Sequence, residues 1–175
     1  MTPISVAILD DFQNVTRSLA NWGRLPPHVS VTAFNDHVEE EPLVERLKLF
    51  DVLVLTRERT KLPRGLVAQL PKLKLVVTAG MRNLGIDLAA CREHGVLVCG
   101  TGSGSSPTAE LAWGLILALA RHIPGEDRSL RSGAWQKTIG TGLKGKTHAV
   151  LGPARLGTQV ARVGLPVHKK VNASS

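Results

Sequence analysis

The feature of this sequence that most constrains its fold is a regular alternation of short apolar runs with stretches of helical periodicity. The first run, at residues 4–9, predicts a strand. Further runs follow at residues 29–34, 52–55, 75–79 and 96–99, and the intervening stretches at residues 15–22, 40–49, 63–70 and 87–94 predict helices. Apolar strands joined by helices indicate a parallel sheet of the α/β class, covered on both faces. Val29, Val52, Val76 and Leu97 are then expected in strands of one sheet.

Candidate site loops follow the predicted strands, because ligands of open parallel sheets bind at the carboxyl ends of the strands. These loops are residues 10–13, 56–61, 78–86 and 100–107. Asp10 and Asp11 in the first loop resemble part of a phosphoacceptor or magnesium site. No third acid or strand-end lysine completes such a site, so we expect a solvated turn here.

A long helix is predicted after the fifth strand, over residues 107–123, with Thr108 in its N-cap region. Residues 111–120 are apolar all round, which indicates a helix buried between two bodies. As a helix this run spans roughly 15 Å, about half of a bilayer core, so no transmembrane span is expected. A further short helix at residues 126–131, a glycine-rich stretch and a sixth strand at residues 147–151 follow.

Composition excludes several classes of protein. Two cysteines, Cys91 and Cys99, are too few for a disulfide scaffold, a four-cysteine zinc site or an iron–sulfur cluster, and no metal site is expected. Cys99 is expected to be a small buried residue, and His148 a structural one. The chain start has no basic segment before Asp10, unlike a signal peptide. These features predict a soluble, cytoplasmic protein without a membrane partner.

The formal net charge of +8 is unevenly placed. Residues 1–127 hold 13 lysines and arginines against 14 acidic residues, whereas residues 128–175 hold nine basic residues and no acidic one. A basic tail for nucleic acid would show aromatic interleaving, which is absent here beyond Trp135, so no nucleic-acid partner is expected. The asymmetry instead indicates a boundary near Asp127 and a domain that is cut short.

Three glycine-rich loops compete as phosphate-binding sites. Residues 140–147 match the P-loop pattern G-x-x-x-x-G-K-[ST], but Thr147 enters a strand rather than opening a helix, so we expect a chance match. Residues 100–107 join a strand to a helix and are either a flexible crossover or one wall of a ligand cleft. Residues 152–157 lie between a strand and a helical stretch, the context of a dinucleotide-binding turn.

At these residues the chain resembles the D-isomer-specific 2-hydroxyacid dehydrogenases, over about residues 4–164. The blocks that carry the resemblance, in order, are Arg57-Glu-Arg-Thr-Lys61, Pro71-Lys-Leu-Lys-Leu-Val-Val-Thr-Ala-Gly-Met-Arg-Asn-Leu-Gly-Ile-Asp87, Pro107-Thr-Ala-Glu110, Leu143-Lys-Gly-Lys-Thr147 and Gly152–Gly157. The resemblance implies a flavodoxin-like substrate domain at residues 1–106. It also implies a crossover helix with the truncated start of a Rossmann NAD-binding domain at residues 107–164, followed by a divergent tail.

The resemblance also implies site residues and ligands. The substrate, a small 2-hydroxy or 2-keto acid, would be held by Arg57 and by the loop of Ala79, Gly80, Met81, Arg82 and Asn83. The cofactor, NAD with NADP not excluded, would be held by Thr108, Gly152, Arg155, Leu156 and Gly157. The resemblance also allows that two copies of the chain form a homodimer.

The chain departs from the family at several points. Ala154 replaces the middle glycine of the cofactor turn, and Pro153 removes a backbone donor there. The family's catalytic arginine, glutamate and histidine match no residue of this chain, and His168 in the unmatched tail is no substitute. Pro166 is expected to break the helix that leads to the second Rossmann strand. We therefore expect a chain that is inactive as it stands, or alternatively a non-catalytic binding or dimerisation module.

Overall fold

The computed structural model describes residues 2–102, 104, 106–152, 154–167 and 170–174, the last of these by backbone only. The chain divides into two compact units, unit 1 at Met1–Ser103 and unit 2 at Gly104–Ser175.

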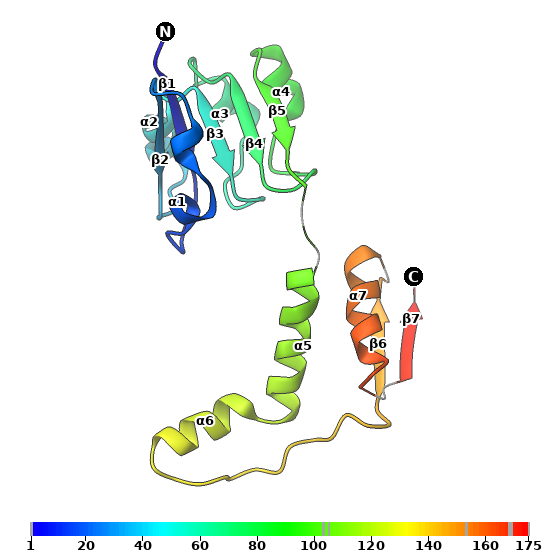
Figure 1. Ribbon diagram of the computed structural model, residues 1–175. Helices are drawn as coiled ribbons and strands as arrows, with labels where there is room; N and C mark the ends of the chain where they lie inside the picture. Colours follow the sequence, from blue (N-terminus) through cyan, green and yellow to red (C-terminus); the bar gives the residue numbers. More distant parts are fainter. Residues whose placement is uncertain (1, 103, 105, 153, 168–169, 175) are drawn as a thin grey trace. The chain divides into compact units, whose positions relative to one another are not determined.

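Unit 1 is built on a five-stranded parallel sheet (Figure 1). Its strands are β1 (Ile4–Ile8), β2 (Val29–Ala33), β3 (Val52–Leu55), β4 (Leu75–Thr78) and β5 (Leu97–Gly100), in the order β2-β1-β3-β4-β5. This order is that of the flavodoxin-like doubly wound fold, with the reversal point between β1 and β3. The predicted sheet is confirmed, and Val29, Val52, Val76 and Leu97 all lie in it.

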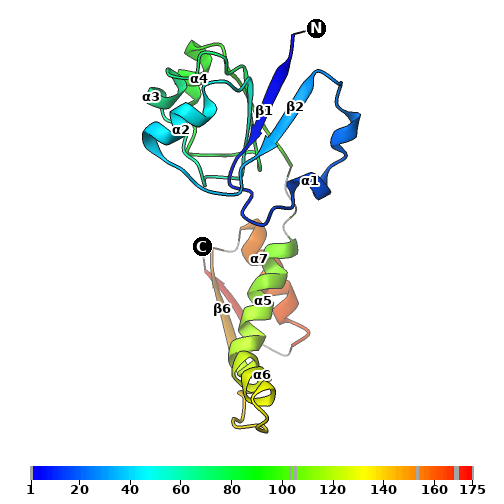
Figure 2. The same cartoon turned by 90° about the vertical axis from the view of Figure 1, so that its left-hand side faces the viewer.

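The helices of unit 1 lie between the strands, as expected, but several are shorter than the periodicity predicted. They are α1 (Thr16–Leu19), the 3₁₀ turn η1 (Trp22–Arg24), α2 (Glu40–Leu47), α3 (Arg64–Val67) and α4 (Leu88–Glu93). Figure 2 shows α2, α3 and α4 on one side of the sheet and α1 on the other. Asp87 caps the N-terminus of α4, because its Oδ1 accepts a hydrogen bond from Ala90 N at 2.8 Å.

The hydrophobic core lies on the side of the sheet that α2, α3 and α4 cover. Leu53 and Leu55 of β3 and Val76 of β4 are fully buried, because alternate residues of a strand point to the same face. Leu43 and Leu47 of α2 meet them from the helix layer. These side chains belong to one buried cluster that joins the sheet to its helix layer.

Unit 2 contains a two-stranded parallel sheet with one helix packed on it and a second, longer helix packed on the first. Its elements are α5 (Ser106–Ala120), α6 (Ile123–Arg131), β6 (Thr147–Leu151), α7 (Arg155–Gly164) and β7 (Lys170–Ser174). Trp113 joins α5 to the rest of the unit, since its Nε1 donates to Val160 O of α7 at 2.8 Å. The Trp113 ring also meets the His148 ring edge-on, so His148 contributes to packing, as expected.

Two expectations for unit 2 were wrong. Helix α5 begins at Ser106, which places Thr108 inside the helix rather than in its N-cap region. The helix is also not buried all round: Leu111 is 64% exposed and Leu119 is 79% exposed. Only one side of α5 packs on α7, because the two-stranded sheet is too small to cover the other sides. No helix in the described part of the chain is long and apolar enough to cross a membrane.

The tail also differs from expectation. Helix α7 ends at Gly164, before Pro166, yet the chain still returns as β7 and pairs in parallel with β6. The proline therefore ends the helix without preventing the second strand. The strand–helix–strand unit β6-α7-β7 is the opening motif of a Rossmann fold.

Candidate functional site

The loop of residues 56–61, which follows β3, is anchored to the end of β1 by the buried residue Asp10. Thr60 Oγ1 donates to Asp10 Oδ2 at 2.6 Å, and Arg59 Nη1 donates to Asp10 O at 2.7 Å. Thr56 Oγ1 donates to Leu9 O at 3.1 Å. Asp10 is only 1% exposed and has a left-handed backbone with φ of 59°. Our expectation of a solvated turn was wrong here, because the neighbouring loop satisfies this carboxylate.

Asp11 is also buried, and it acts as a cap for the short helix α1. Its two carboxylate oxygens accept from Val15 N at 3.1 Å and from Thr16 N at 3.0 Å. Burial opposes ionisation, but the hydrogen bonds from Thr16 and Val15 prevail and lower the pKa of Asp11. Both aspartates therefore hold the strand-end loops in place rather than facing solvent.

The loop of residues 79–86, which follows β4, is tied to its neighbours on both sides. Leu62 N donates to Gly85 O at 2.7 Å, and Asp87 N donates to Leu62 O at 3.0 Å. On the other side Gly80 N donates to Thr101 Oγ1 at 3.1 Å. Loops from three neighbouring strands are thus fixed against one another at the carboxyl edge of the sheet.

Gly100, the last residue of β5, allows the loop after β4 to approach its backbone closely. A Cβ at this position would lie 2.7 Å from Gly80 O and 2.8 Å from Met81 Cα. Both neighbours are backbone atoms, so only glycine fits without moving the loop. Neither Gly100 nor Thr101 carries a local sequence signal of its role, although both lie in the candidate loop at residues 100–107.

Arg57 lies over this loop. A Cβ on Gly80 would lie 2.7 Å from Arg57 Nη1, so the guanidinium passes directly above the glycine. Both residues have positive φ, 56° for Arg57 and 93° for Gly80. The Arg57 side chain is about half exposed, and its Nε lies 3.7 Å from Glu58 Oε2. Most of the guanidinium therefore remains open to a ligand. The structure thus places the Arg57 side chain against Gly80 of this loop.

The same loop also carries the three backbone N–H groups of residues 81–83. Among the described residues, none accepts a hydrogen bond from Met81 N, Arg82 N or Asn83 N. The side chains of Met81 and Arg82 are exposed, whereas Asn83 is buried. Free N–H groups beside a guanidinium form a favourable site for a carboxylate. We call Arg57 together with residues 79–83 the loop site.

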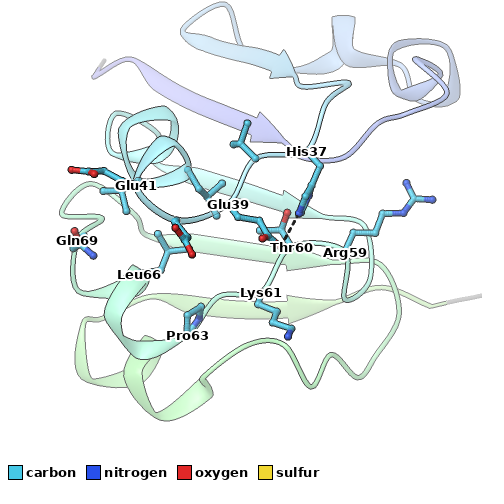
Figure 3. Close-up of a pocket in the computed structure, with 13 residues that line it drawn as sticks. His37, Glu39, Glu41, Arg59, Thr60, Lys61, Pro63, Leu66 and Gln69 are labelled. Atoms are coloured by element: carbon cyan, nitrogen blue, oxygen red, sulfur yellow. Dashed lines mark hydrogen bonds and ion pairs between the residues drawn. The ribbon is translucent and has the colours of Figure 1, made fainter.

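Unit 1 also contains a pocket of about 520 Å³ that the sequence analysis missed (Figure 3). It lies between the start of α2 and the segment from Arg59 to Leu66. Its polar wall includes His37, whose Nδ1 is 2.7 Å from Asp10 Oδ1 and whose Nε2 is 3.3 Å from Glu39 Oε1. The hydrogen bonds to Asp10 and Glu39 raise the pKa of His37. His37 thus joins the exposed Glu39 to the buried Asp10, which in turn holds Thr60 of the loop at residues 56–61.

In unit 2, the predicted cofactor turn has the expected strand–turn–helix geometry. Gly152 follows β6 with φ of 71°, and α7 begins at Arg155 after Ala154 as N-cap. A Cβ on Gly157 would lie 2.7 Å from Gly152 O, so this glycine permits the close helix–strand packing of a dinucleotide-binding turn. Ala154 is extended and exposed, and Pro153 lies outside the described residues, as does His168.

The remaining predicted cofactor residues are accessible. Leu156, the second residue of α7, is 42% exposed. Thr108 is exposed in the first turn of α5, a helix that packs against α7. The structure thus brings together Gly152, Arg155, Leu156 and Gly157 at one turn and places Thr108 on the neighbouring helix.

The other candidate loops and residues have simpler explanations. The P-loop match at residues 140–147 runs directly into β6, and Lys146 N donates to Leu143 O at 3.1 Å within a turn, so the match is a chance one. In the loop of residues 100–107, Ser103 and Ser105 lie outside the described residues. Cys99 is exposed on the edge strand β5, which contradicts the expectation of a buried residue. No group of metal-ligating side chains is present in the part of the chain that the structure describes.

Comparisons with known proteins agree on one family. A family model described as "D-isomer specific 2-hydroxyacid dehydrogenase, catalytic domain" matches residues 6–164. The hydroxypyruvate reductase of Thermotoga maritima is 36% identical over 142 residues, which cover 79% of this chain and 46% of that protein. The D-3-phosphoglycerate dehydrogenase of Methanocaldococcus jannaschii is 40% identical over 126 residues, which cover 70% of this chain and 24% of that protein.

Solved structures give the same result. The phosphoglycerate oxidoreductase of Vibrio cholerae o395 superposes with a TM-score of 0.90 and 39% identity, over 98% of this chain and 56% of that one. The chain therefore spans about half of that relative. The family match at residues 6–164 covers most of unit 1 and continues through unit 2 to the end of α7. This chain belongs to the D-isomer-specific 2-hydroxyacid dehydrogenase family.

Proposed function

We propose that this chain forms the substrate-binding part of an NAD-dependent D-2-hydroxyacid dehydrogenase, and that the loop site binds the carboxylate of a small 2-hydroxy or 2-keto acid. The observation that carries the proposal is the set of free N–H groups of Met81, Arg82 and Asn83 beside the Arg57 guanidinium. Hydrogen bonds from these groups to a carboxylate are charge-assisted and therefore stronger than neutral ones. They would fix the acid end of the substrate and leave its C2 carbon free to react.

The residues of unit 2 fit the cofactor in part. Gly152, Arg155, Leu156 and Gly157, with Thr108 nearby, would hold NAD, which supplies the hydride acceptor of the reaction. The close contact at Gly157 supports this assignment, whereas the methyl group of Ala154 restricts the approach of a pyrophosphate. We therefore expect this chain to bind NAD weakly. The choice between NAD and NADP depends on the residues that contact the ribose.

The chain's own contribution to hydride transfer is to bind and orient the substrate. Abstraction of the alcohol proton needs a general base, for which the family uses a histidine. Among the described residues of unit 1, no histidine forms a hydrogen bond or an ion pair with Arg57 or with residues 79–83. We therefore propose that the 175-residue chain alone binds the acid but does not oxidise or reduce it.

Two measurements test this proposal. Pyruvate, added to the ¹⁵N-labelled chain, should shift the amide signals of Met81, Arg82 and Asn83, whereas acetone, which lacks the carboxylate, should not. Arg57→Ala should weaken pyruvate binding about tenfold, which corresponds to about 1.4 kcal/mol. Arg24→Ala removes the same charge from the exposed turn η1 and should leave the affinity unchanged. Shifts confined to other parts of the chain would contradict the proposal.

Turnover is tested separately. The purified chain, mixed with NADH and pyruvate, should oxidise NADH no faster than a heat-denatured sample. A rate that clearly exceeds this background would show that the chain holds its own acid–base group.

A second function, from a different class, is supported by the exposed leucines of α5. Leu111, Leu115 and Leu119 lie at helical spacing and are each more than half exposed. Such a face favours self-association through a non-catalytic interface. Size-exclusion chromatography should then show a dimer that Leu115→Glu converts to a monomer, with Glu110→Gln as a control on the same helix. A monomer at all concentrations would exclude this function.

A further inference from the structure

The side chain of Asn83 joins three segments at the loop site. Its Nδ2 donates to Arg57 O at 2.6 Å and to Thr78 Oγ1 at 2.9 Å, while its Oδ1 accepts from Gly85 N at 2.9 Å. Arg57 O is only an acceptor and Gly85 N only a donor, so the orientation of the amide is fixed by its partners. The residue is 9% exposed.

These bonds change what Asn83 can do for a substrate. Both Nδ2 protons are used within the chain, and only part of the acceptor capacity of Oδ1 remains. An oxygen acceptor can add nothing to the binding of a carboxylate. The family resemblance places Asn83 in the substrate loop, but the geometry leaves only its backbone N–H for that contact.

The bond from Asn83 to Arg57 O acts on a residue with an unfavourable backbone conformation. Arg57 has φ of 56°, which side chains other than glycine rarely adopt. Such a conformation persists only where surrounding contacts fix it. The hydrogen bond from Asn83 fixes the carbonyl, and this backbone geometry directs the guanidinium over Gly80.

We infer that the Asn83 side chain is a positioning residue that holds Arg57 in its left-handed conformation and so keeps the guanidinium beside the free N–H groups of the loop. This inference rests on the proposed function, because the guanidinium matters only if the loop site binds an acid. It assigns to Asn83 a role through Arg57 rather than a direct contact of its side chain with the ligand.

The test is a double-mutant cycle on the full chain, with pyruvate as the probe. Asn83→Ala should weaken pyruvate binding at least fivefold, and Arg57→Ala should weaken it about as much. In the Arg57→Ala background, Asn83→Ala should then weaken pyruvate binding little further, because the guanidinium that Asn83 positions is already absent. Asn21→Ala, at an exposed position of unit 1 before η1, is the matched control and should bind pyruvate normally.

A second readout needs no ligand. The backbone ¹³C and ¹⁵N chemical shifts of Arg57 report its left-handed conformation, and in Asn83→Ala they should move toward values typical of negative φ. Unchanged Arg57 shifts in Asn83→Ala would overturn the inference. So would an equal loss of affinity with and without the Arg57 side chain. If Asn83→Ala does not fold, Asn83→Ser is measured in the same way.

The two proposals fail in different ways. If the unmodified chain does not bind pyruvate at all, the proposed function is wrong, while the Arg57 shifts still decide the role of Asn83. If pyruvate binds but Asn83→Ala leaves both affinity and shifts unchanged, only the positioning role is wrong.

Discussion

The two units of this chain bury their apolar side chains to very different extents. All members of the main hydrophobic cluster belong to unit 1, whereas the buried apolar residues described in unit 2 are Ala109, Trp113 and Val150. Five strands with three helices on one face enclose a core, but two strands leave the faces of α5 largely open. The same strand–helix repeat therefore gives a closed core only when enough strands lie side by side.

The largest effect is expected on stability, when truncation of a buried side chain in unit 1 is compared with truncation of an exposed one in unit 2. Leu53→Ala removes a fully buried side chain and should lower the free energy of unfolding of unit 1 by about 2–5 kcal/mol. Leu111→Ala, on the exposed side of α5, should change the free energy of unfolding of unit 2 by less than about 0.5 kcal/mol. Urea titrations followed through the amide signals of β4 and β6 measure the two units separately. Equal losses would show that α5 is covered in solution.

The next effect concerns the loop site. Gly100→Ala forces a Cβ against Gly80 O and Met81 Cα, and should destabilise unit 1 by about 1–3 kcal/mol and weaken pyruvate binding. The control is Gly102→Ala, because a Cβ at Gly102 meets no atom within 4 Å. Thermal unfolding and a pyruvate titration measure both consequences. Normal pyruvate binding by Gly100→Ala would mean that the loop tolerates displacement.

A smaller effect is expected at the contact that holds unit 2 together. Trp113→Phe keeps an aromatic ring but removes the N–H that donates to Val160 O, which should cost about 1 kcal/mol. Amide exchange in α7 should become faster as a result. Trp135→Phe, at a residue that is 79% exposed, should leave the exchange unchanged. Faster exchange throughout unit 1 as well would show that the units unfold together.

The smallest effect is the pH dependence of unit 1 through His37. The hydrogen bonds to Asp10 and Glu39 raise the pKa of His37 above its ordinary value of 6.5. A raised folded-state pKa means that the stabilisation is fully present below pH 6.5 and is lost as the pH rises through the folded-state value. The side chain is 33% exposed, so solvent screening keeps the effect small.

Urea unfolding between pH 5.5 and pH 8.5 measures this dependence. His37→Gln should remove the decline with rising pH, whereas His94→Gln, at an exposed histidine of the same unit, should retain it. A decline that persists in His37→Gln would assign the titration to another group.

Much of the fold followed from local pattern. The strands β1 to β6 lie close to their predicted positions, because each is a short apolar run between turn residues. Helix lengths were less predictable: α1 has four residues where eight were expected, since its periodic residues find no neighbouring layer to pack against. The strand β7 was missed because Pro166 argued against a regular continuation, although the chain pairs with β6 again from Lys170 onward.

The loop site was predicted only in part. Arg57 and residues 79–83 were found through a resemblance, and the structure places them together. The groups that hold them there, above all Asp10 and Gly100, could not be recognised, because their roles depend on contacts with residues about 20 to 50 positions away. Asp10 was taken for a solvated residue since nothing local shows that Thr60 and His37 will cover it.

The sequence by itself determined the α/β class, the parallel sheet and the position of the loops at its carboxyl edge, because these depend on periodicity and on turn residues close along the chain. Only the tertiary structure decided which side chains are exposed on α5, which aspartates are buried, and that the Asn83 side chain binds Arg57 instead of facing a ligand. Burial and hydrogen-bond partners are set by elements that meet across the fold, and a linear pattern does not record which elements those are.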